Sequence, residues 1–127
     1  MENKVKHTIE KIIHLSYDFR KRGNISSVNL LKESGYLEFF DQITEEEIEE
    51  MLKLYPHLVD EWLLWSENKR VIEPVWAFMK FDDGSYLVGG KENVEINTKD
   101  EFKACAAFIK LEAEDLRIFL INNPQLL

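Results

Sequence analysis

The chain has 127 residues and a formal net charge of −8 at pH 7, with 45% hydrophobic and 31% charged residues. This length predicts a single domain, 1–127, and the composition is typical of an ordered globular chain. The single cysteine excludes an intramolecular disulfide. The first residues lack the apolar segment of a secretory signal, and no apolar run reaches the ~20 residues of a membrane span. We therefore expect a cytoplasmic protein.

The N-terminal third is predicted to be helical. Apolar residues recur every three or four positions over 4–21, which indicates one amphipathic helix. Ser26 or Ser27 can cap a short second helix over 28–33, and Gly35 follows as a stop. An apolar cluster comes next, and we expect it to pack against the first helix or, alternatively, to form a homodimer face. Its members are Tyr36, Leu37, Phe39 and Phe40.

Two further helices are expected before the sheet. Thr44 and Glu47 form a capping-box pattern at the start of an acidic helix with a buried stripe of Ile48, Met51, Leu52 and Tyr55. Pro56 separates this helix from the next one, which the apolar spacing places at about 57–68. Both segments have the length of ordinary globular helices.

A hairpin and a long helix complete the predicted fold. The segment 75–81 is apolar on both faces, which predicts a central strand or one covered on both sides. Gly84 lies in the predicted turn, 86–88 returns, and 94–96 is a possible third strand. Thr98 and Glu101 suggest a second capping box, at the start of a helix over 99–121. We expect an α+β protein: N-terminal helical segments, a two- or three-stranded antiparallel sheet, and a long C-terminal helix packed on it.

The charge is unevenly distributed along the chain. Residues 38–50 contain seven acidic residues and no Lys or Arg. Such a surface attracts basic proteins and is repelled by phosphate backbones. The candidate partner face consists of Glu45, Glu46, Glu49 and Glu50. The alternative is that these acids keep the protein soluble and favour the N-terminal end of a helix.

Indole and cationic side chains cluster where the fourth predicted helix meets the first strand. The candidate binding residues are Trp62, Trp65, Ser66, Lys69, Arg70 and Trp76. Trp and Arg are the residues most enriched at binding hot spots, and Arg can hold a carboxylate through two hydrogen bonds. The alternative is that the indoles are core residues, as aromatic side chains at helical spacing usually are.

The sequence contains no motif for catalysis or a cofactor. His7 and His14 are about 10.5 Å apart along a helix, too far to share a metal ion. Cys105 lies on an apolar stripe, as a buried structural cysteine does. Ser66 and Lys69 match the Ser-x-x-Lys spacing of a serine nucleophile, but without the motifs that accompany it. Phosphate-binding glycine motifs are absent, and the negative charge disfavours nucleic acid.

The leading hypothesis is a small acidic protein that binds a basic protein partner without catalysis, of the antitoxin, immunity or adaptor type. The alternative is a small-ligand-binding or minor hydrolase domain. In that case a pocket would lie between the helix Trp62–Arg70 and the strand that carries Trp76. The two hypotheses differ in whether that place is hollow or solid.

Overall fold

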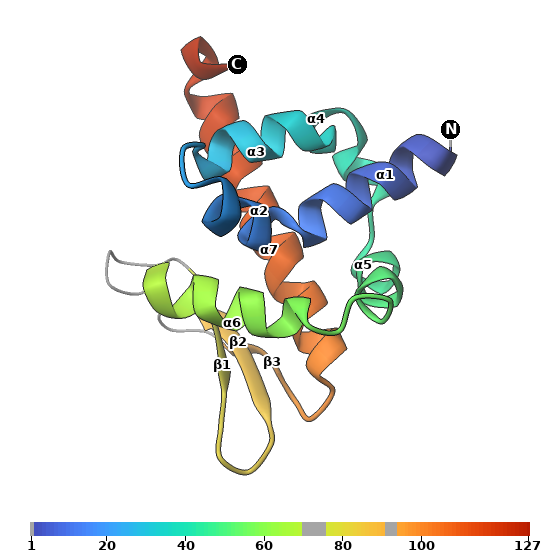
Figure 1. The fold of residues 1–127 in the computed structure, drawn as a ribbon, viewed down its shortest axis with the longest axis vertical. Helices are drawn as coiled ribbons and strands as arrows, with labels where there is room; N and C mark the ends of the chain where they lie inside the picture. Colours follow the sequence, from blue (N-terminus) through green and yellow to red (C-terminus); the bar gives the residue numbers. More distant parts are fainter. Residues whose placement is uncertain (1, 70–75, 91–93) are drawn as a thin grey trace.

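The computed structural model describes residues 2–69, 76–90 and 94–127, and it confirms the α+β class (Figure 1). A series of helices precedes a three-stranded sheet, and a long helix follows it. The elements are α1 (Glu2–Ile13), α2 (Leu15–Arg22), α3 (Ser27–Ser34), α4 (Tyr36–Phe39), α5 (Glu45–Leu52), α6 (Leu58–Lys69), β1 (Trp76–Lys80), β2 (Tyr86–Gly90), β3 (Val94–Thr98) and α7 (Glu101–Asn122). None of the helices in the described ranges has both the length and the apolarity to cross a membrane.

The prediction of one N-terminal helix over 4–21 is wrong, because the helix breaks at His14 into α1 and α2. The His14 Nδ1 atom lies 2.7 Å from the carbonyl oxygen of Glu10, and its ring meets Tyr55 edge-on. The carbonyl of Ile13, at the end of α1, accepts a hydrogen bond from the Trp62 indole at 2.8 Å. Apolar spacing continues through the break because α1 and α2 both bury side chains in the same core, so periodicity does not reveal it.

The next two helices follow the sequence closely. The Ser26 hydroxyl caps α3 by accepting the Asn29 N–H, and Gly35 ends that helix with φ of 90°. A Cβ atom at position 35 would lie 2.8 Å from the Thr8 hydroxyl oxygen, so only glycine fits this approach of α4 to α1. Tyr36 and Phe39 are buried, and α4 contacts α1. The apolar cluster therefore packs inside the chain, against the first helix as expected.

The two predicted capping boxes have different outcomes. Thr44 and Glu47 form a complete capping box at the start of α5, as predicted. At the start of α7 the cap is Asp100 instead of Thr98, because its carboxylate accepts the N–H groups of Phe102 and Lys103. Thr98 is still part of β3, and its hydroxyl accepts the N–H of Asp100. The real cap is two residues later than the motif indicates.

The sheet is antiparallel with the order β1-β2-β3. Gly84 has φ of 88° in the β1–β2 turn, where its N–H bonds to the carbonyl of Phe81 at 3.0 Å. The register between β2 and β3 shifts between Val88 and Gly89, so a bulge lies at the first of the two glycines that end β2. In the described sheet β1 is an edge strand, which leaves the second of the two expected alternatives, a strand covered by other elements. Its apolar faces are explained by contacts with both α6 and α7.

Helix α7 runs along the long axis of the molecule and connects its two ends (Figure 1). It contacts all three strands of the sheet as well as α5 and α3. Cys105 is buried on this helix, as its place on an apolar stripe predicts, and so are Ile109 and Leu120, whereas Phe119 is 47% exposed. Helix α6 packs against three elements, α2, β1 and α7.

Candidate functional site

Trp62, the first of the predicted binding residues, belongs to the core. Its side chain is 1% exposed, and its indole N–H donates to Ile13. The ring meets Phe108 edge-on, with 6.0 Å between centroids. A buried indole normally finds such a hydrogen-bond partner, and here the partner fixes α6 against the end of α1. Trp62 is therefore placed to hold helices together.

Ser66 and Trp76 join α6 to the sheet. Ser66 is fully buried, and its hydroxyl oxygen accepts the backbone N–H of Phe78 at 2.8 Å. Trp76 is half-buried and packs against the core from β1. The Lys69 side chain and Arg70 lie outside the described residues, so the predicted Ser66–Lys69 pair and an Arg70 clamp are not tested.

Trp65 faces a cavity of about 470 Å³ that lies against α2, α6 and α7, with Ser27 of α3 at one side. Of the described candidate residues, Trp65 alone lines it. The cavity is not at the expected place between α6 and the hairpin; it lies where α6 meets α2. Its apolar walls come from Phe19, Leu64, Trp65 and Leu116.

Two buried polar side chains line this cavity. Ser16 is 3% exposed, and within the described parts of the chain its hydroxyl oxygen has no hydrogen-bond partner. Glu112 is 4% exposed, and its carboxylate accepts the indole N–H of Trp65 at 2.9 Å. Because buried polar atoms are nearly always paired in native proteins, Ser16 is the unusual group of this site.

An ion pair lies at the rim. The Arg20 guanidinium donates two hydrogen bonds to the Glu61 carboxylate, at 3.0 and 2.7 Å, which connects α2 to α6. Beside it Phe19 and Leu64 are 41% and 42% exposed, and Phe19 meets Trp65 edge-on. The entrance is thus partly apolar, and a bidentate pair fixes the two helices that form it.

Ser16 and Glu112 are not among the site residues that the sequence predicts. Each lies on the buried side of a helix among apolar residues, so its periodicity is that of a core position. A polar residue at such a position is a usable signal, since burial of a hydroxyl or carboxylate is costly unless something binds it. The spacing itself does not say whether that partner is protein or ligand.

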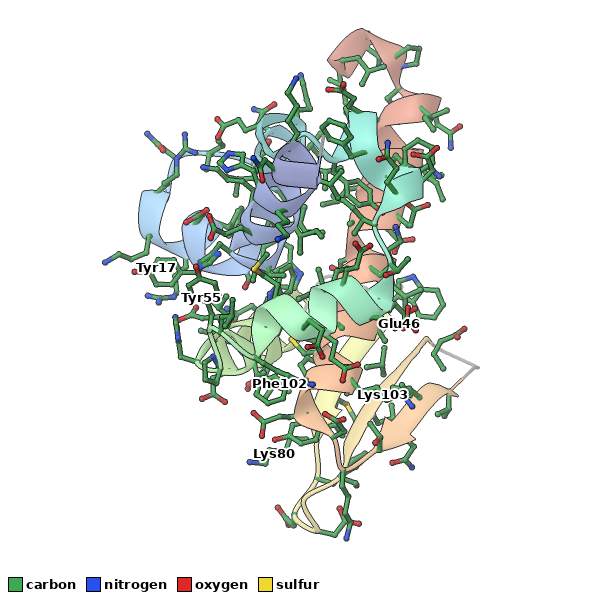
Figure 2. The ribbon with its side chains drawn as sticks, turned by 90° about the vertical axis from the view of Figure 1, so that its right-hand side faces the viewer. Tyr17, Glu46, Tyr55, Lys80, Phe102 and Lys103 are labelled. Atoms are coloured by element: carbon green, nitrogen blue, oxygen red, sulfur yellow. The ribbon has the colours of Figure 1, made fainter. Side chains whose placement is uncertain are left out.

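The predicted acidic face on α5 is less isolated than the sequence suggests. Lys53 pairs with Glu50 at 2.9 Å and with Glu49 at 3.9 Å. The pKa of Glu45 is raised, first by burial and then by the neighbouring charge of Glu46, while nearby lysines oppose the shift. One of them is Lys103, on the same side of the molecule as Glu46 (Figure 2). Folding therefore places cations near carboxylates that are alone in the sequence.

The other reactive groups in the described parts of the chain give no second site. Cys105 is buried, and burial raises the pKa of its thiol well above the ordinary value, so little thiolate forms. In the described ranges no three His, Cys, Asp or Glu side chains are grouped to hold a metal ion. Comparisons with protein-family models, with curated proteins and with solved structures find no match to this chain.

Proposed function

We propose that this protein binds a small, mostly apolar molecule in the cavity beside Trp65. The observation that supports this function is the cavity itself, whose volume of about 470 Å³ lies in the range of ~300–1,000 Å³ typical of ligand sites. Its walls combine aromatic and aliphatic side chains with a few polar groups, as such sites do. This is the ligand-binding alternative that the sequence suggests, but at the place where α6 meets α2 and α7 instead of between α6 and the hairpin.

The cavity volume limits the size of the ligand. An apolar cavity of roughly 150 Å³ accommodates one benzene ring. The present cavity is about three times larger, so a fused two-ring aromatic compound or an aliphatic compound of similar size fits inside. We therefore choose 2-methylnaphthalene, a neutral hydrocarbon, as the first probe.

Isothermal titration calorimetry with 2-methylnaphthalene tests the proposal. We expect saturable binding at one site, and a shift of the Trp65 indole N–H resonance in the NMR spectrum. The variant Leu64→Trp places a larger side chain at the rim and should weaken binding. Leu54→Trp is the matched control, because Leu54 is 72% exposed and does not line the cavity. Absence of binding, or equal weakening by both variants, would contradict the proposal.

A second candidate function is the binding of a basic protein partner through α5, in the cytoplasm and without catalysis. What favours it is the exposure of Glu45, Glu46 and Glu50 on one helix, since acidic surfaces accelerate association with basic partners. The test is affinity capture from native lysate at low and high salt. In the control variant Glu45, Glu46, Glu49 and Glu50 are all changed to Gln. Partners without basic bias, or capture that salt and the substitutions leave unchanged, would contradict this function.

A further inference from the structure

The hydroxyl of Ser16 is the polar group of the cavity that most needs a partner. The side chain is almost completely buried and lines the cavity, yet its oxygen has no hydrogen bond within 2–69, 76–90 and 94–127. A buried hydroxyl left unpaired destabilises a protein, and each such group in a native structure requires an explanation. A ligand that hydrogen-bonds to this oxygen supplies one.

The rest of the polar wall bears on the charge of that ligand. The described residues that line the cavity include three carboxylates, from Glu61, Glu112 and Asp115, and one guanidinium, from Arg20. The guanidinium already donates from Nε and from Nη2 to the Glu61 carboxylate. An anion would lose its hydration in this mostly apolar space, which costs more than the desolvation of a neutral polar group.

We infer that the ligand of this cavity is a neutral, mostly apolar molecule with one hydroxyl, carbonyl or amide group that hydrogen-bonds to Ser16 Oγ. The inference rests on the proposed ligand-binding function and adds the chemical class of the ligand. Ser16 Oγ can donate or accept, so it does not distinguish an alcohol from a ketone. It does distinguish both from a hydrocarbon, which leaves the hydroxyl unpaired.

Three probes that share one ring system test the inference: 2-methylnaphthalene, 2-naphthylmethanol and 2-naphthoate. We expect the alcohol to bind about three- to tenfold more tightly than the hydrocarbon, the gain of one buried neutral hydrogen bond. The carboxylate should bind most weakly. Tighter binding of 2-naphthoate than of the alcohol would overturn the inference, and so would equal affinity for alcohol and hydrocarbon. If none of the three binds, it is the proposed function itself that fails.

The variant Ser16→Ala assigns the preference to one atom. It should reduce the ratio of alcohol affinity to hydrocarbon affinity to about one, and Ser16→Thr, which retains a hydroxyl, should restore part of it. Ser85→Ala in the hairpin turn is the control, because Ser85 does not line the cavity and bonds to Asp83. A ratio that Ser16→Ala leaves unchanged would show that the alcohol pairs elsewhere, and would overturn the inference.

Discussion

Helix α6 packs against its neighbours on two sides, which are lined by similar residues but differ in how they are filled. On one side, Trp62 and Ser66 are buried and hydrogen-bonded, to Ile13 and to Phe78. On the other side, Trp65 faces a cavity of about 470 Å³ together with Ser16, whose buried hydroxyl has no partner in the described chain. Each side thus has one indole and one buried serine.

The difference shows which features of a site identify it. Tryptophan content does not, because Trp62 and Trp65 are three residues apart and their rings are 5.6 Å apart. The pairing of polar atoms does, because the first side is complete without a ligand and the second is not. If this distinction is correct, equivalent substitutions on the two sides should have different consequences.

The largest difference is expected between the two tryptophans. Trp62→Ala should reduce the free energy of unfolding by about 3–5 kcal/mol, since it removes a fully buried ring and leaves a cavity. Trp65→Ala should cost clearly less, because Trp65 is only half-buried and already borders empty space. Urea denaturation followed by circular dichroism measures both. Equal losses would show that the side with the cavity is packed as tightly as the other.

The two buried serines provide a closer comparison. Ser66→Ala leaves the buried N–H of Phe78 without an acceptor, which should cost about 1–3 kcal/mol of stability. Ser16→Ala removes an unpaired hydroxyl, so stability should stay the same or rise by up to about 1 kcal/mol. Both substitutions replace Ser by Ala within a helix, so the gain in helix propensity cancels in the comparison. A loss of stability in Ser16→Ala comparable to that in Ser66→Ala would mean that Ser16 already has a partner.

Most of the fold follows from local signals in the sequence. The capping box at Thr44, the stop at Gly35 and the hairpin turn at Gly84 are each fixed by the chemistry of a few neighbouring residues. The errors have a common cause. The break at His14 and the cap at Asp100 depend on contacts with distant segments, which periodicity does not encode.

The site is less predictable for the same reason. The sequence places Trp65 on a helix with apolar neighbours, but whether that face is filled depends on how α2 and α7 approach it. Ser16 comes from α2 and Glu112 from α7, and they are 96 positions apart in the sequence. The local sequence signal for such a site is a polar residue inside an apolar stripe.

The rim pair offers the smallest and most specific test of the comparison. Arg20 and Glu61 connect the helices on the side with the cavity, and the Arg20 side chain is 49% exposed, so water and salt screen the pair. Arg20→Gln and Glu61→Gln should therefore lower the denaturation midpoint less than Ser66→Ala does. The effect should decrease further at high salt, and the double variant should resemble either single variant if the two side chains act only through each other.

The ion pair Arg22–Glu33, with both side chains about half exposed, is the matched control that does not line the cavity. If the rim pair holds the entrance in shape, breaking it should change the affinity for 2-naphthylmethanol, and breaking the control pair should not. Equal effects of the two pairs on affinity would show that the rim pair contributes only to the general stability of α2.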